Sequence, residues 1–358
     1  MKAYITSTGI ISPQETHKGE NFPGFVREEV SNSLMCMEPD YRLLINPLQL
    51  RRMPRILKMG LAAARLCINR SGGINPDGII VGTGLGCLDN LEKFLLDVLD
   101  NHEHITSVLP FINSTHNAVA AHIAMLLHNH GYNLTYCHRG LSFESALDDA
   151  LMNLEEKRAS HILVGGIDES TNDFRHLFSY LGYWKNPISN LLLQEDKSPG
   201  SIAGEGSAFF MLSSVPLDGH HVIVNAVHTF ITPNTAKESD IIPEIDLFLK
   251  NQDTDKKDIS LLLAGMNGDA NFDPVYKLLR QNYFSSQTGL AWYKHLCGEY
   301  YTSSSFALWL ASVILETQVI PKITELISPE RSEIGKILIY NHIRNSEHAL
   351  ILVSHGKI

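Results

Sequence analysis

The 358-residue chain is poor in cysteine, and the cysteines it has are scattered. They are Cys36, Cys67, Cys87, Cys137 and Cys297, an odd number with no Cys-x-x-Cys pair. Such spacing argues against both a disulfide framework and a zinc ribbon. We therefore expect free thiols in a reducing cytoplasm.

Long apolar runs are missing as well. The longest apolar stretch is Phe306–Leu315, well short of the ~20 residues that a membrane-spanning helix needs. The first nine residues are too short and too polar for the core of a signal peptide. We expect a soluble protein without a membrane span.

Positive charge is in deficit. The chain has 29 Lys and Arg against 39 Asp and Glu, a net charge of −10 with His neutral. This balance argues against nucleic acid as a partner, because binding a phosphate backbone needs a basic surface. The 17 His residues form no His-Glu-x-x-His motif, and Gly-x-Ser-x-Gly is absent. We therefore expect no metal site, no cofactor and no nucleophile elbow of the α/β-hydrolase type.

Short β-branched or apolar runs alternate with helical patterns along the chain, which predicts an α/β fold with helices packed on sheets. The expected strands are Ala3–Thr8, Gly78–Gly82, Asn133–Tyr136, His161–Val164, Ser207–Leu212, His221–Ala226, Ser260–Ala264, Lys336–Tyr340 and Ala349–Val353. The expected helices are Pro54–Ile68, Asn90–Leu99, Asn117–His128, Ser142–Lys157, Pro274–Asn282 and Phe306–Thr317. A turn-rich seam around Pro216 divides the chain into two parts, 1–215 and 216–358.

Several segments, in order and at compatible spacing, resemble the β-ketoacyl-acyl-carrier-protein synthases of the thiolase superfamily. They are Tyr4–Pro13, Arg51-Arg52-Met53-Pro54-Arg55, Gly82-Thr83-Gly84-Leu85-Gly86, Pro110–Met125, Val164-Gly165-Gly166-Ile167-Asp168-Glu169 and Ile202-Ala203-Gly204-Glu205-Gly206. The resemblance implies a layered α-β-α-β-α fold of two similar halves, with two mixed sheets, in a dimeric protein. It also implies acylation of a Cys at a helix N-terminus, with two His residues assisting decarboxylative condensation.

The nucleophile position of the family falls on Gly140 when the chain is aligned without gaps from Gly131 and from Gly165-Gly166. A competing alignment uses Thr135–Gly140 and makes Cys137 the nucleophile, at the expense of two compensating gaps. We prefer Gly140. Under the competing alignment the protein is an active, divergent synthase that uses Cys137, with His138 or His342 nearby.

The two His positions of the family are also substituted. Asn267 stands at the first, and Glu299 stands at the second, five residues after a matching Lys294. An amide cannot exchange protons near neutral pH, and an anionic carboxylate cannot donate to an enolate. The loop 341–348 also lacks the glycines and the gating Phe of the family pattern.

These departures resemble the chain-length-factor class, whose members pair with an active ketosynthase in fatty-acyl or polyketide biosynthesis; an aryl-polyene pathway is one such setting. The expected partners are an acyl carrier protein and a ketosynthase, in a homodimer or a heterodimer. Arg51, Arg52, Arg55 and Lys58 are the one basic patch of the acidic chain, suited to docking an acidic carrier protein. A carrier-protein or acyl-binding module without a synthase partner is the remaining alternative.

Overall fold

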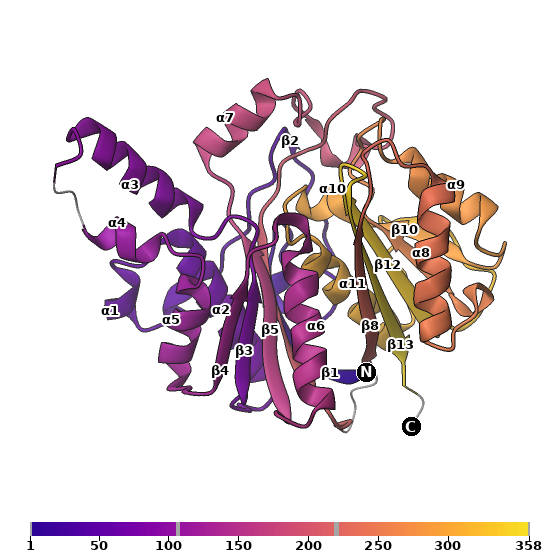
Figure 1. The fold of residues 1–358 in the computed structure, drawn as a ribbon, viewed down its shortest axis with the longest axis horizontal. Helices are drawn as coiled ribbons and strands as arrows, with labels where there is room; N and C mark the ends of the chain where they lie inside the picture. Colours follow the sequence, from indigo (N-terminus) through magenta and orange to yellow (C-terminus); the bar gives the residue numbers. More distant parts are fainter. Residues whose placement is uncertain (1, 105–107, 218–221, 357–358) are drawn as a thin grey trace.

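Every strand-like run expected from the sequence joins one large mixed sheet in the computed structural model, which describes residues 2–104, 108–217 and 222–356 (Figure 1). The strand order is β11-β10-β9-β12-β13-β8-β1-β7-β5-β3-β4. The resemblance implied two sheets, but a short β1–β8 ladder, Ala3 with Val224 and Tyr4 with Ile223, joins them into one.

Most of the expected strands are longer than the patterns that predicted them, because flanking residues join the ladders; β3 keeps its expected bounds and β9 is one residue shorter. In the first half they are β1 (Ala3–Ile11), β3 (Gly78–Gly82), β4 (Tyr132–Tyr136), β5 (His161–Asp168) and β7 (Gly206–Ser213). In the second half they are β8 (Val222–Ile231), β9 (Leu261–Ala264), β10 (Gly289–Trp292), β11 (Glu325–Ile327), β12 (Lys336–Ile343) and β13 (Glu347–His355). A separate two-stranded ladder joins β2 (Val30–Ser31) to β6 (Ile188–Ser189). His221, the first residue of one expected strand, lies outside the described residues.

The two halves repeat the same strand connectivity. From the central ladder outward, the first half runs β1-β7-β5-β3-β4 and the second runs β8-β13-β12-β9-β10. In both halves the first three strands are antiparallel, and the last three are parallel. The two halves are therefore similar, as the resemblance implied. We propose the boundary between them at 215/216, in the connection from β7 to β8.

Helices cover both outer faces and fill the middle, which gives the α-β-α-β-α layering. The helices are α1 (Pro47–Leu50), α2 (Arg55–Arg70), α3 (Leu88–Asp100), α4 (Val108–Asn113), α5 (Ala118–Leu127), α6 (Ser142–Glu155), α7 (Asn172–Tyr180), α8 (Glu238–Asn251), α9 (Pro274–Asn282), α10 (Lys294–Cys297) and α11 (Ser304–Thr317). In Figure 1, α2 and α5 lie on one side, α8 and α9 on the other, and α6 and α11 between the two half-sheets.

Three apolar cores hold these layers together. The central core packs α6 and α11 against the inner faces of both half-sheets, and its largest fully buried side chains include Phe143, Phe306 and Trp309. The two outer cores pack α8 and α9 on the second half and α2 and α5 on the first. Within the described ranges, no helix has the length and apolar character needed to cross a bilayer.

Candidate functional site

A pocket lies where the parallel strands of both halves end. Its lining comes from the turn after β3 (Leu85), the end of β5 (Asp168), the turn after β9 (Asn267), the segment after α10 (Glu299) and the end of β12 (Ile343). The carboxyl ends of parallel strands are where α/β proteins place their ligands. The fold therefore brings Asn267 and Glu299, predicted from the sequence as positions of one site, into a single pocket.

Gly140 lies beside this pocket, in the turn that leads into α6. Its neighbour Arg139 lines the pocket, and its own N–H donates to Glu347 Oε2 at 2.9 Å. A Cβ atom at Gly140 would overlap the Ile343 side chain and lie 2.7 Å from Glu347 Oε2. The space that a nucleophilic side chain would need is therefore filled from the β12–β13 hairpin.

Asn267, Glu299 and Lys294 form one connected group. The Asn267 amide donates to Glu299 Oε2 at 2.6 Å, and Lys294 Nζ donates to both Glu299 oxygens at 2.9 and 2.8 Å. The Lys294 side chain is fully buried, so the Glu299 carboxylate is its compensating partner inside the protein. The group can hold charge and donate hydrogen bonds, but its ion pair occupies the carboxylate that would have to act as an acid.

Asp168 fastens the two halves together under the pocket. One of its oxygens accepts hydrogen bonds from the Thr83 hydroxyl and the Gly84 N–H, and the other accepts both the N–H and the hydroxyl of Thr302. The glycine-rich turn after β3 is thereby tied to the start of α11. In the sequence Asp168 stands out only as part of a motif, because its partners come from segments far apart in the chain.

The β-ketoacyl synthase N-terminal domain model matches residues 31–216, a little more than half of the chain. The chain belongs to the β-ketoacyl synthase family. A search of curated proteins finds no match.

Solved structures of ketosynthases share the fold over almost the whole length of this family member. The ishigamide ketosynthase/chain length factor superposes with a TM-score of 0.82 at 15% identity, over 99% of each chain. A β-ketoacyl synthase from Burkholderia phymatum gives 0.78 at 12% identity, over 99% of this chain and 100% of the other. A ketosynthase in complex with its chain length factor from Xenorhabdus doucetiae gives 0.74 at 15% identity, over 99% and 98%. At these identities the likeness establishes the ketosynthase fold.

Cys137, the alternative nucleophile of this ketosynthase-fold chain, lies outside the pocket lining. Its side chain is exposed after β4, with Sγ 3.5 Å from the Gly84 carbonyl oxygen. Partial burial and the charge of Asp168 raise the pKa of the Cys137 thiol, which favours the unreactive protonated form.

Within the described part of the chain, neither His proposed to assist Cys137 is hydrogen-bonded to its thiol. The His138 ring meets the Ser145 hydroxyl at 3.0 Å. His342 is buried and stacks on Tyr276 with ring centroids 4.7 Å apart, and burial lowers the pKa of its imidazole well below the usual value. Among the residues that the structure describes, no cysteine or histidine lines the pocket, and no cluster of metal-ligand type is present.

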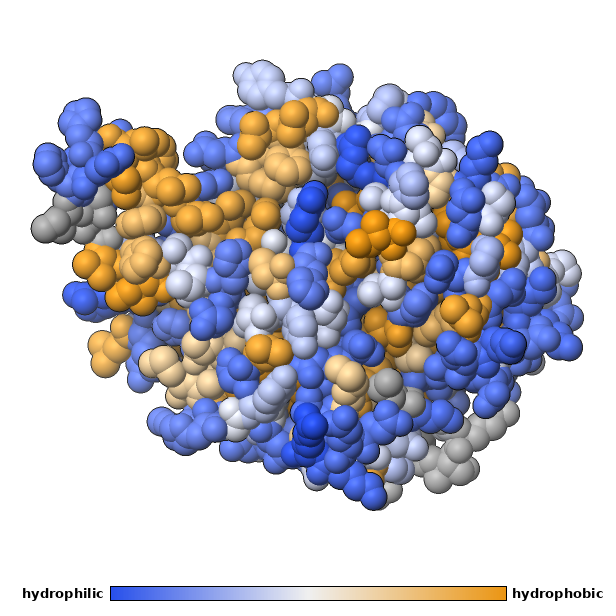
Figure 2. All heavy atoms as spheres, in the orientation of Figure 1, coloured by the Kyte–Doolittle hydropathy of each residue, from blue (hydrophilic) through white to orange (hydrophobic). Residues whose placement is uncertain are grey.

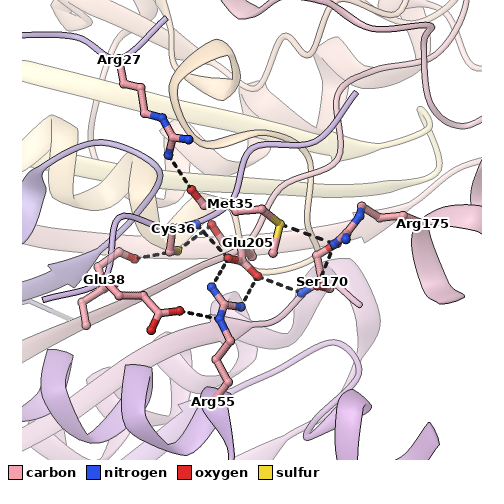
Figure 3. Close-up of polar contacts among 9 residues, drawn as sticks. Arg27, Met35, Cys36, Glu38, Arg55, Ser170, Arg175 and Glu205 are labelled. Carbon is pink, nitrogen blue, oxygen red and sulfur yellow. Dashed lines mark hydrogen bonds and ion pairs between the residues drawn. The ribbon is translucent and has the colours of Figure 1, made fainter. Parts of the chain in front are cut away.

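The basic patch expected for carrier-protein docking divides into two parts. Arg51 and Arg52 are exposed before α2, and Lys58 is half-buried on it. Arg55 instead donates through Nε to Glu38 and through both terminal nitrogens to the buried Glu205 (Figure 3). The Arg55 charge is therefore shared between two carboxylates, and the docking that we propose relies mainly on Arg51, Arg52 and Lys58.

Glu205, the acid of the Gly-Glu-Gly segment, is the centre of that network. Besides Arg55, it accepts hydrogen bonds from the backbone N–H groups of Cys36 at 2.8 Å and Ser170 at 3.1 Å (Figure 3). These contacts hold the loop 32–38, which forms no helix or strand, against the end of β5. The motif signal in the sequence thus marks a buried structural carboxylate next to the site.

Proposed function

We propose that this protein is a non-condensing, chain-length-factor-like subunit that pairs with an active ketosynthase in fatty-acyl or polyketide biosynthesis. The observation that carries the proposal is the filled space at Gly140, where Ile343 and Glu347 occupy the volume of the missing side chain. A thioester-forming nucleophile needs both a side chain and an unoccupied helix N-terminus there. This chain offers neither.

The Asn267–Glu299–Lys294 group supports the same proposal. Condensation needs groups that stabilise an enolate and exchange protons. Asn267 does not titrate near neutral pH, and Glu299 is held by Lys294 as one side of an ion pair. These contacts hold the side chains of the group rigidly in the pocket lining, and they do not suit proton transfer.

A second ketosynthase-fold subunit would fit the edge of the first half. β4 ends the sheet, and its outer edge has no strand partner among the described residues. Exposed apolar side chains also gather on α3 and α4 of the same half, including Leu95, Leu99, Val108, Phe111 and Ile112; Figure 2 shows this surface in orange over the two helices. An unpaired edge strand and an exposed apolar surface are each typical of a subunit interface.

Two of the similar structures were solved with partner proteins. One is a ketosynthase in complex with its chain length factor. The other is a type II acyl-carrier protein in complex with its ketosynthase, and it matches this chain with a TM-score of 0.76 at 13% identity, over 99% of each chain. By analogy, we propose a ketosynthase and an acyl carrier protein as the partners here, with docking at Arg51, Arg52 and Lys58. The five cysteines are all unpaired, which supports the proposed cytoplasmic setting.

Co-purification of the tagged chain with candidate ketosynthases tests the pairing. We expect a stable complex with one of them, and loss of that complex in Leu134→Asp, which places a charge on β4. Leu247→Asp, on the exposed face of α8, is the matched control and should retain the complex. Thermal melting of both free variants checks that they fold. A chain that stays monomeric with every candidate would contradict the proposal.

A further inference from the structure

The tip of the β12–β13 hairpin, residues 343–348, is bonded to the connection between β8 and α8, residues 232–237. The Thr232 N–H donates to the Ser346 carbonyl oxygen at 2.9 Å, and the Ser346 hydroxyl donates to the Thr232 carbonyl oxygen at 3.1 Å. The β8–β13 ladder reaches the same place, with Glu347 opposite Ile231. The tip is therefore an extension of the central sheet, and two of its side chains add further hydrogen bonds.

Asn345 supplies the first of these side-chain contacts. Its Nδ2 donates to the carbonyl oxygens of Asn234 at 3.2 Å and Ala236 at 2.7 Å, and the residue is buried. Asn345 also has φ of 53°, a left-handed conformation that Asn and Gly adopt more readily than other residues. The turn alone would accept a glycine, so the two bonds to the connection are what asparagine adds.

His348 supplies the second contact. Its ring stacks on Phe230 with centroids 4.7 Å apart. Its Nδ1 lies 2.9 Å from the Tyr340 hydroxyl, and its Nε2 lies 2.8 Å from the Thr232 hydroxyl. The Thr232 hydroxyl donates to the Asn345 carbonyl oxygen at 3.2 Å, so it accepts from the imidazole. Burial lowers the pKa of His348 to about 4. The imidazole is therefore neutral at pH 7, and it donates at Nε2 while accepting from Tyr340 at Nδ1.

The same hairpin tip fills the space at Gly140. Glu347 accepts the Gly140 N–H through Oε2 at 2.9 Å, and its Oε1 lies 3.7 Å from Arg139 Nε in an ion pair. Ile343 occupies the place of a Cβ at Gly140. Because Ile343 and Glu347 flank one tight turn, a tip that is held at the connection holds both of them at Gly140.

We infer that Asn345, Thr232 and His348 form a latch that holds the hairpin tip closed over the start of α6. They are positioning residues, because they act on Gly140 through Ile343 and Glu347. The corresponding loop of the family pattern carries glycines and a gating Phe, so the latch is a feature of this chain. The inference goes beyond the proposed function, because it concerns the free chain and holds with or without a ketosynthase partner.

Hydrogen exchange of the full chain, read by mass spectrometry of short peptides, tests the latch. Asn345→Gly removes the two side-chain hydrogen bonds and leaves a residue that accepts the positive φ. Because the lost hydrogen bonds weaken the closed state locally, the Gly140 N–H should exchange about tenfold faster or more. Peptides of α2 should exchange as in the unmodified chain. Unchanged exchange at Gly140, or an equal rise in α2, would overturn the inference.

Variants of the other two latch residues extend the test. Thr232→Val should speed the exchange of the Gly140 N–H, whereas Thr232→Ser keeps the hydroxyl and should retain the protection. His348→Phe keeps a ring on Phe230 but loses both hydrogen bonds, so it should also speed exchange. Asp253→Gly is the control, since it changes another residue of positive φ, 46°, and should leave Gly140 protected. A Gly140 N–H that stays protected in Thr232→Val and His348→Phe, or that opens equally in Thr232→Ser, would contradict the assignment.

Discussion

Gly140 shows how one absent side chain changes what a helix terminus can do. The N-terminus of a helix attracts anions, which is how the family activates a thiolate. Here the anion at that terminus is the carboxylate of Glu347, bonded to the Gly140 N–H. Ile343 from the same hairpin fills the adjoining space. The terminus is satisfied internally, so it has no need of a thiolate or a ligand.

Gly140→Ala should lower the free energy of unfolding by about 1–3 kcal/mol, because its Cβ overpacks against Ile343. Urea denaturation measures the effect. Gly24→Ala is the control, since Gly24 has open space where a Cβ would lie, and it should stay within ~0.5 kcal/mol. Adding Ile343→Ala to Gly140→Ala should give a non-additive recovery. Strict additivity would contradict the packing described at this position.

The Arg55–Glu205 ion pair is the second position where a single residue decides a local structure. Glu205→Gln should cost about 3 kcal/mol, because the Arg55 charge loses its buried partner and keeps only the partly exposed Glu38. The control is Asp40→Asn, which breaks an exposed pair with Arg42 and should leave the unfolding midpoint nearly unchanged. Comparable losses in both variants would show that Glu205 is not the anchor of this network.

At the scale of elements, α6 carries a buried acid that makes its stability depend on pH. Burial raises the pKa of Glu144 from 4.5 to about 7, and the Ser304 hydroxyl and Lys294 charge lower it by less. Because the folded-state pKa is the higher one, the unfolded state ionises first as pH rises. The ionisation of Glu144 therefore costs nothing well below pH 4.5 and destabilises the fold increasingly as the pH rises to about 7.

Glu144→Gln should thus gain stability over the unmodified chain by on the order of 3 kcal/mol between pH 4.5 and pH 7–8. Urea unfolding of both proteins across this range gives the difference. Asp149→Asn, on the same helix, is a useful comparison because Asp149 already accepts a hydrogen bond from Tyr132. A pH-independent difference for Glu144→Gln would contradict the raised pKa.

Most elements were predictable from local patterns, and the exceptions have physical causes. Gly78–Gly82 and Pro274–Asn282 are found at their expected bounds. α8 was missed because Pro243 interrupts it, although Ile241, Ile245 and Phe248 form a buried stripe. α7 was missed although Thr171 caps it, because it buries no residue fully. Its role is to supply ring faces to the pocket.

The site was only partly predictable. Positions 267, 294 and 299 could be found because family motifs surround them, and the fold brings them together. The Ile343 and Glu347 contacts at Gly140 could not be found, because they come from a hairpin some 200 positions away in the chain. The ion pair of Arg55 with the buried Glu205 could not be predicted either, because a cluster of basic residues in a sequence does not show which of its charges are paired.

At the scale of the whole molecule, the repeat explains why the chain holds a pocket at all. Each half places the carboxyl ends of its three parallel strands at the pocket, and Asp168 ties the first half to α11 of the second. The net charge of −10 leaves Arg51, Arg52 and Lys58 as a local basic surface. That contrast would help to steer an acidic carrier protein to the docking site that we propose.

Turnover tests the central claim most directly. Acyl and malonyl carrier proteins are supplied to the isolated chain, to the partner ketosynthase and to the reconstituted pair, and both released CO₂ and condensed product are measured. We predict no condensation by the isolated chain, product from the pair, and no change in either when Cys137→Ala is introduced. Robust condensation by the isolated chain that Cys137→Ala abolishes would contradict the account.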